Sequence, residues 1–232
     1  MKNIFRNIIL PLNIMLILAV ILGDICYITL GKLEIKATTS IFFVLLGLVN
    51  LTYVVITQRQ MLPFPTVMFI GLCFAMLGDI LLNIKFIIGA LLFAVGHICY
   101  FIAYNFVQKF KLTDLIYGIA IFIPSVIFIL CMPFFDFGGL LMKIIVVAYA
   151  LIISLMVGKS IANLVAQPTV QNILIMVGSI LFFFSDLMLL LNVFGNLSEV
   201  FDVLCLATYY PAECILATAI FTQKTQKSNY QA

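Results

Sequence analysis

Five ionisable residues lie inside long apolar stretches of the sequence. They are Asp24, Asp79, His97, Asp186 and Glu213. A carboxylate at the centre of a membrane helix costs about 2.5–3.5 kcal/mol to insert, so such residues are candidate functional residues by default. Carboxyl and imidazole groups held in different environments can serve as general acid and general base in one reaction. These residue types therefore indicate proton-transfer chemistry within a membrane.

The composition places these residues in a membrane protein. Of the 232 residues, 65% are hydrophobic and 9% are charged, whereas roughly a quarter of the residues of a soluble domain are charged. This composition excludes a soluble enzyme, a nucleic-acid-binding module and a disordered chain. The twelve basic residues are scattered, so we expect no nucleic-acid partner.

Charged residues, Pro and Gly divide the chain into eight apolar segments. Each is close to the roughly 20 residues that cross a bilayer as a helix. The expected spans are residues 7–30, 38–58, 64–83, 86–107, 112–132, 139–162, 171–194 and 200–222. The predicted fold is therefore all-α, a polytopic membrane bundle of eight transmembrane helices in one domain, residues 1–232. We expect the first segment to be an uncleaved span, because it has no small-x-small cleavage site and polar residues interrupt it at Asp24.

The distribution of basic residues predicts that both termini are cytoplasmic. With the N-terminus inside, eight basic residues lie on the cytoplasmic side: Lys2, Arg6, Arg59, Lys109, Lys111, Lys159, Lys224 and Lys227. Four lie outside: Lys32, Lys36, Lys85 and Lys143. The short loops favour a bacterial inner membrane as the location.

Polar residues recur at helical spacing on one face of three of the predicted spans and cluster within one turn of a fourth. They are Asp79 and Asn83; His97, Tyr100 and Tyr104; Ser179 and Asp186; and Tyr209, Tyr210 and Glu213. Polar faces of membrane helices turn away from lipid. We therefore predict a buried polar chamber between these helices.

Asp24 and the six cysteines are expected to have structural roles. Asp24 falls near the outer end of its span, where it would be wetted at the interface. The cysteines lie in apolar stretches without C-x-x-C spacing, which is typical of packing residues.

Several short motifs lie in order between residues 70 and 220. Residues 77–82 and 89–100 read LGDILL and GALLFAVGHICY, which resemble the G-D-x-x-L and G-x-x-x-F-x-x-x-H-x-x-Y of the family of YhhN-like membrane proteins. Residues 149–156 and 178–186 read YALIISLM and GSILFFFSD, similar to its Y-A-x-x-x-x-x-M and G-A-x-x-F-x-x-S-D. Residues 209–216 read YYPAECIL and lie where the family has a Tyr followed by a polar residue and L-I. Glu213 stands where the family usually has Gln or another non-acidic polar residue.

The resemblance implies an eight-helix fold and lysoplasmalogenase activity, the hydrolysis of the alkenyl ether of a lysoplasmalogen to a fatty aldehyde and a glycerophospho head group. A vinyl ether reacts by protonation of its β-carbon, which leaves an oxocarbenium ion. Glycosidases handle a related ion with two carboxyl groups in different environments. We therefore predict that Asp79, Asp186 and His97 are catalytic, with the acid and the base left unassigned. The substrate-binding candidates are Asn83, Tyr100, Tyr104, Ser185, Tyr209 and Glu213.

The expected partners are the lysophospholipid substrate and membrane lipids, and the oligomeric state is left open. We expect no cofactor and no metal, because zinc sites prefer several His or Cys ligands and His97 is the only histidine. Two other functions fit the same residues. A proton-coupled transporter of a small or lipid-like solute also uses intramembrane acids, and a structural protein could use them to join helices.

Overall fold

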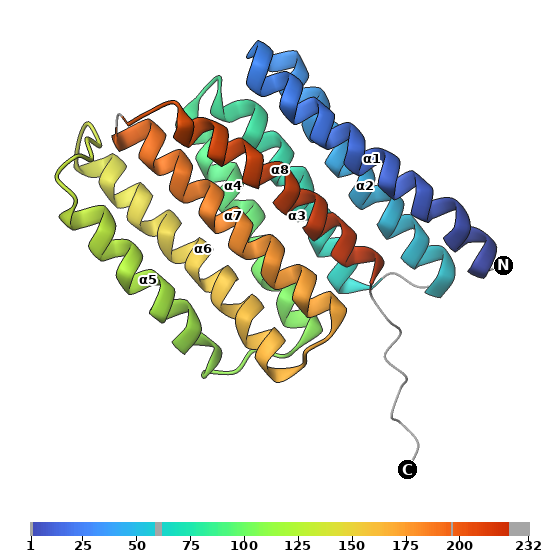
Figure 1. The fold of residues 1–232 in the computed structure, drawn as a ribbon. Helices are drawn as coiled ribbons and strands as arrows, with labels where there is room; N and C mark the ends of the chain where they lie inside the picture. Colours follow the sequence, from blue (N-terminus) through green and yellow to red (C-terminus); the bar gives the residue numbers. More distant parts are fainter. Residues whose placement is uncertain (1, 59–61, 196, 223–232) are drawn as a thin grey trace.

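The computed structural model describes residues 2–58, 62–195 and 197–222, and over these ranges it consists of α-helices and the short loops that connect them (Figure 1). The eight helices are α1 (Lys2–Leu30), α2 (Leu33–Gln58), α3 (Pro63–Leu82), α4 (Phe86–Val107), α5 (Asp114–Cys131), α6 (Leu140–Ala166), α7 (Val170–Gly195) and α8 (Val200–Phe221). All eight contain a stretch long and apolar enough to cross a membrane. The prediction of an all-α membrane bundle is confirmed.

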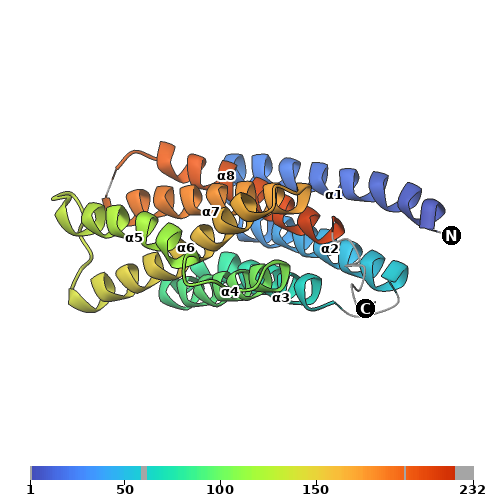
Figure 2. The same cartoon turned by 90° about the horizontal axis from the view of Figure 1, so that it is seen from below.

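Successive helices pair as hairpins, and the pairs assemble around α8. Helix α8 packs against α1, α2, α3 and α7, whereas the described part of α5 packs only on α6. Figure 2 shows α1, α8 and α7 in one layer and α2, α3 and α4 in the other, with α6 running diagonally beside them. The central position of α8 brings its polar residues close to those of α2, α3 and α7.

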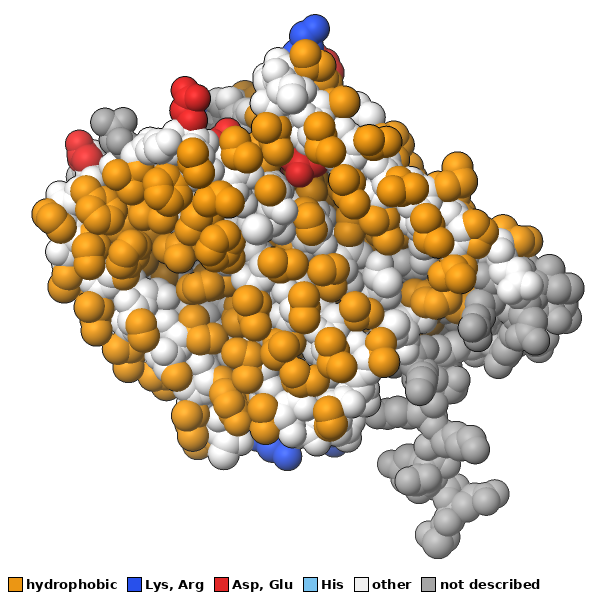
Figure 3. All heavy atoms as spheres, in the orientation of Figure 1, with side chains coloured by type: hydrophobic (Ala, Val, Ile, Leu, Met, Phe, Trp, Pro, Cys, Tyr) orange, Lys and Arg blue, Asp and Glu red, His pale blue; other side chains and the backbone are white. Residues whose placement is uncertain are grey.

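The outer surface of the bundle is apolar. In Figure 3 hydrophobic side chains cover most of the visible face, and charged side chains gather towards the two ends. Large side chains such as Met15, Leu112 and Leu140 are exposed, which is the arrangement expected when lipid rather than water is the solvent. The chain is an integral multi-pass membrane protein.

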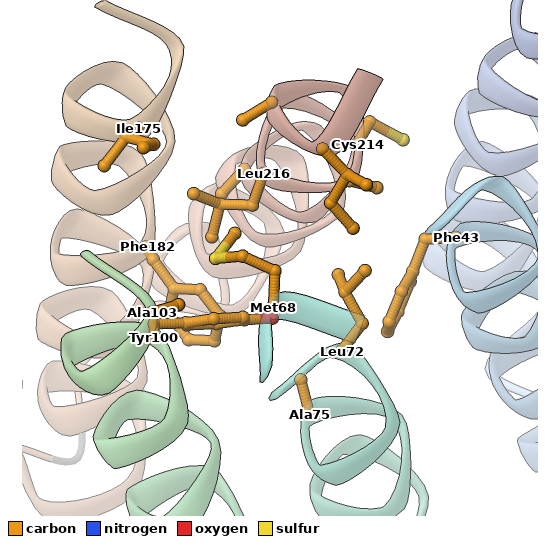
Figure 4. Close-up of a cluster of buried hydrophobic side chains, with 14 of the residues drawn as sticks. Phe43, Met68, Leu72, Ala75, Tyr100, Ala103, Ile175, Phe182, Cys214 and Leu216 are labelled. Atoms are coloured by element: carbon orange, nitrogen blue, oxygen red, sulfur yellow. The ribbon is translucent and has the colours of Figure 1, made fainter. Parts of the chain in front are cut away.

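The packed core holds α3, α4, α7 and α8 together just beneath the polar residues. Side chains including Met68, Leu72, Tyr100, Phe182 and Leu216 converge from these helices in Figure 4. Phe182 of α7 also makes edge-to-face contacts with Phe93 of α4 and Tyr209 of α8. Such contacts are directional, so they help to fix the rotation of each helix about its axis.

Glycine sets the close approach of α3 to α4. A Cβ atom added at Gly89 would collide with the backbone of Leu82, and one at Gly78 would lie 3.0 Å from the ring of Phe93. Small residues at such crossings let membrane helices approach closely. Gly78 of the Gly-Asp motif thus draws the helix of Asp79 against the helix of His97.

Two expectations about charged residues are wrong. Helix α2 begins at Leu33, so Lys36 is buried inside it and not in a loop. Asp24, expected to be wetted, is only 7% exposed. Lys159, whose side of the membrane stays a prediction, is buried in α6 and pairs with Asp114 at 2.6 Å. A buried opposite charge explains why both lysines can leave water.

The orientation of the bundle stays a prediction. Arg59, Lys224 and Lys227 lie outside the described residues, as do the side chains of Lys2 and Arg6. Because Lys36 and Lys159 are held in buried ion pairs, they no longer report on the side of the membrane.

Candidate active site

Asp79 of α3 is held by three donors from two other helices. Its Oδ1 lies 3.0 Å from Nζ of Lys36. Its Oδ2 accepts hydrogen bonds from the hydroxyls of Ser40 at 2.6 Å and Tyr210 at 2.9 Å. An ionised carboxylate only accepts hydrogen bonds, and charge-assisted bonds are the stronger ones. The surroundings of Asp79 therefore suit a carboxylate that keeps its negative charge.

Lys36 is the cation of the site, and the sequence reasoning missed it. Its Nζ also donates to Oδ1 of Asn83 at 2.8 Å and lies 5.3 Å from the centre of the Tyr27 ring. Asn83 in turn donates from Nδ2 to the Tyr27 hydroxyl at 2.9 Å. The available signal was the i, i+4 spacing of Lys36 and Ser40, which places both on one face of a helix.

Asp186 of α7 belongs to a second cluster with one residue from α4 and one from α6. The hydroxyl of Tyr149 donates to Oδ2 of Asp186 at 2.7 Å. Nε2 of His97 lies 2.8 Å from that hydroxyl and 3.2 Å from the same carboxylate oxygen. Tyr149 opens the motif at residues 149–156 but had been given no role. Its position on a different helix, six spans into the chain, hid the contact from sequence reasoning.

The tautomer of His97 follows from its neighbours. Nδ1 has no hydrogen-bond partner among the described residues, whereas Nε2 faces two oxygens. A proton on Nε2 can be donated to these oxygens, and Nδ1 is then left as an acceptor only. His97 and Tyr149 together orient Oδ2 of Asp186 and leave its Oδ1 without a protein donor among the described residues.

Two cavities meet at Asp186. A polar cavity of about 560 Å³ is lined by both Asp79 and Asp186, with Lys36 and Asn83. An apolar cavity of about 400 Å³ lies between α4, α5, α6 and α7 and includes Tyr149 and Asp186 in its wall. Among the described residues, Asp186 is the only charged residue that lines both cavities. The predicted chamber thus has a polar part and an apolar part, and the Asp186 carboxyl lies at their boundary.

The two cavities extend towards different surroundings. The polar cavity reaches Glu199 and Asp202, which are exposed where α7 connects to α8. The apolar cavity has Ile87 and Pro124 in its walls, and both are also exposed on the lipid-facing surface. One part therefore faces the end of the bundle, and the other faces hydrocarbon.

Asn83, Ser185 and Tyr209 line the polar cavity, as a substrate-binding role requires. Two of them also make internal bonds. The Ser185 hydroxyl donates to the carbonyl oxygen of Cys205 at 2.9 Å, and the Tyr209 hydroxyl donates to that of Ala75 at 3.3 Å. Of the three, only Asn83 forms its side-chain hydrogen bonds with other polar side chains of the cavity, those of Lys36 and Tyr27.

Tyr100, Tyr104 and Glu213 lie in the packed core, outside the walls of the two cavities. Tyr100 donates to Oε2 of Glu213 at 2.7 Å, and the hydroxyls of Tyr104 and Ser179 are 2.8 Å apart. All four residues are fully buried. These two hydrogen bonds join α4 to α7 and α8, but Oε1 of Glu213 has no hydrogen-bond partner among the described residues.

No group of three or more His, Cys, Asp or Glu is placed to hold a metal ion within the described ranges. The chemistry available to the site is that of its carboxyl, hydroxyl, imidazole and ammonium groups.

Eight spanning helices around buried acids define a polytopic membrane protein with a site between its helices. The chain matches the model of the YhhN family over residues 35–220 and belongs to that family. The matched segment runs from α2 to α8, so it includes Lys36 as well as both carboxylates. No curated protein and no solved structure matches the chain.

Proposed function

We propose that the protein is a lysoplasmalogenase of the bacterial inner membrane, an intramembrane hydrolase that cleaves the vinyl-ether bond of lysoplasmalogens. The observation that carries the proposal is the position of Asp186, whose carboxyl lines both the polar and the apolar cavity. A lysoplasmalogen has one alkenyl chain and one polar head group, joined at the bond to be cleaved. With the chain in the apolar cavity and the head group in the polar one, that bond lies beside Asp186.

Asp186 is the general acid in this proposal. It transfers a proton to the β-carbon of the vinyl ether, and the α-carbon and the ether oxygen then share the positive charge. A water molecule attacks the α-carbon and returns its proton to Asp186. The resulting hemiacetal breaks its bond to the glycerol oxygen, which takes up the hydroxyl proton, and a fatty aldehyde is released.

Asp79 is the ionised carboxylate. Its bonds to Lys36, Ser40 and Tyr210 fix its orientation in the wall of the polar cavity. A negative charge placed in advance near a developing cation lowers the barrier, since the site needs no reorganisation during the reaction. The different surroundings of Asp79 and Asp186 support this division of the two roles that the sequence left open.

The test is aldehyde release by detergent-purified protein from choline- and ethanolamine-type lysoplasmalogens, with an ester-linked lysophospholipid as the control substrate. Asp186→Asn should lower the rate to background, and the near-isosteric Asn should leave the unfolding temperature close to that of the wild type. Aldehyde release at the wild-type rate by Asp186→Asn would refute the mechanism.

Proton-coupled transport is the second candidate, and the buried Lys36–Asp79 pair is the observation that favours it, because ion pairs inside a bundle are used in proton relays. Proteoliposomes distinguish the two. Release of aldehyde without a proton gradient supports the hydrolase, and gradient-driven uptake of intact lipid without aldehyde supports the transporter.

A further inference from the structure

The polar cavity carries an unbalanced set of charges. Its walls include one basic residue, Lys36, and four acidic residues, Asp79, Asp186, Glu199 and Asp202. The ammonium of Lys36 lies 3.0 Å from Asp79 and is buried with it. The positive charge of the cavity is therefore already compensated within the protein.

The remaining acids lie at successive depths along the cavity. Asp186 is deep, at the boundary with the apolar cavity, whereas Glu199 and Asp202 are exposed at the other end. The Asp202 side chain accepts a long hydrogen bond of 3.4 Å from Asn192, which lines the cavity as well. A molecule filling this cavity thus meets neutral donors on Tyr27, Asn83 and Asn192 and negative charge at the exposed Glu199 and Asp202.

We infer that Glu199 and Asp202 select the lipid head group, favouring heads that carry an ammonium and rejecting heads whose net charge is negative. The inference rests on the proposed function, because the vinyl ether must lie at Asp186 for the head group to extend towards α8. The phosphate then lies along the stretch containing Tyr27, Asn83 and Asn192, which offers hydroxyl and amide donors. The terminal ammonium reaches the two acids, and an anionic terminus in the same place is repelled.

A structural role is the competing explanation for these two acids. Glu199 and Asp202 stand at the start of α8, where negative side chains stabilise a helix through its dipole. That role would affect stability and would act equally on all substrates. The decisive quantity is therefore the ratio of kcat/KM between two head groups and not the rate with one of them.

The experiment compares the wild type with the double variant Glu199→Gln, Asp202→Asn on two lysoplasmalogens that differ only in the head, ethanolamine or glycerol. We expect the wild type to prefer ethanolamine. In the variant the ratio of kcat/KM for ethanolamine to that for glycerol should fall about five- to tenfold, the combined effect of two solvent-exposed charges. The preference should also shrink as salt is raised, since exposed charges are screened. An unchanged ratio in the variant would overturn the inference.

Glu34→Gln is the matched control. Glu34 is an exposed acid in the first turn of α2, as Asp202 is in the first turn of α8, but it is outside the walls of the polar cavity. Its substitution should leave the head-group ratio within about twofold of the wild-type value. If Glu34→Gln reduced the head-group preference as much as the double variant does, the preference would come from the general electrostatic field of the exposed acids. That result would overturn the assignment to Glu199 and Asp202.

Binding separates this inference from the proposed function. Saturated alkyl-ether lysolipids lack the vinyl bond, so their affinity can be measured by calorimetry whether or not the protein hydrolyses lipid. If no lysoplasmalogen yields aldehyde, the proposed function fails, and a wild-type preference for the ethanolamine head that the double variant loses still supports the head-group site. Equal affinity of the wild type for both heads overturns the inference even if aldehyde is released.

Discussion

Nζ of Lys36 lies 3.0 Å from Oδ1 of Asp79, and the two side chains are only 5% and 4% exposed. The pair joins α2 to α3 in the half of the bundle where the two cavities meet. Both partners were taken out of water together, so each is stable in the membrane because the other is present. The same contact keeps Asp79 oriented in the cavity wall.

Lys36→Met should destabilise the protein strongly. It leaves the Asp79 carboxylate buried without its cation, and removal of one partner of a buried ion pair costs about 3–5 kcal/mol. The double variant Lys36→Met, Asp79→Leu should recover most of the lost stability, because neither charge is then buried. Thermal unfolding in detergent measures both effects. If the stability losses of the two substitutions simply added in the double variant, Lys36 and Asp79 would not be energetically coupled. Both variants should be inactive in aldehyde release.

Tyr149→Phe should lower kcat by about 100-fold with little change in KM, within the range usual for a group that assists proton transfer. The hydroxyl that bonds both Asp186 and His97 is lost, while the ring keeps its edge-to-face contact with His97 at 5.5 Å. Tyr53→Phe serves as the control, since that ring packs on Phe221 and is outside the walls of both cavities. Steady-state kinetics on a lysoplasmalogen decides the matter, and a wild-type kcat would remove Tyr149 from the mechanism.

Glu213→Gln should leave kcat/KM within about twofold of the wild type, because a residue outside the catalytic contacts has no part in stabilising the transition state. Glu213 is fully buried and bonded to Tyr100, outside both cavities. Gln has nearly the same shape and keeps an oxygen that can accept this bond. If the variant lost activity as Asp186→Asn does, Glu213 would have to be counted as a third catalytic acid.

Ala90→Phe should shorten the alkenyl chain that the enzyme prefers. Ala90 lines the apolar cavity, so a larger side chain fills the space intended for the end of the chain. Turnover of a long-chain lysoplasmalogen should fall about tenfold relative to that of a short-chain one, the scale of one or two methylene contacts. Ala148→Phe places the same side chain on an exposed position of α6 outside this cavity. Equal chain-length profiles for both variants would exclude the apolar cavity as the chain site.

EDTA should leave aldehyde release unchanged, because the proposed reaction uses only groups of the protein. The assay is run before and after overnight dialysis against the chelator. Loss of activity that zinc restores would replace the carboxylic acid mechanism with a metal-assisted one.

Much of the site could be predicted from the sequence because charge is rare in a membrane span. Asp79, His97 and Asp186 stood out for that reason, and the spacing of Asn83 from Asp79 placed both on one helix face. Lys36 escaped because it lies near the end of its helix, where a basic residue is usually at the interface. Tyr149 escaped because a single tyrosine in an apolar span is commonly a packing residue.

The sequence by itself determined that this protein lies in a lipid bilayer, how many helices it has and which of their residues are too costly to bury without a partner. These properties depend on composition and on helical spacing, which act over short stretches of chain. The tertiary structure decided which polar groups meet: Asp79 with Lys36, Asp186 with Tyr149 and His97, and Glu213 with Tyr100. Such pairings depend on the rotation and crossing of helices far apart in the chain, and these are set by the packing of the whole bundle.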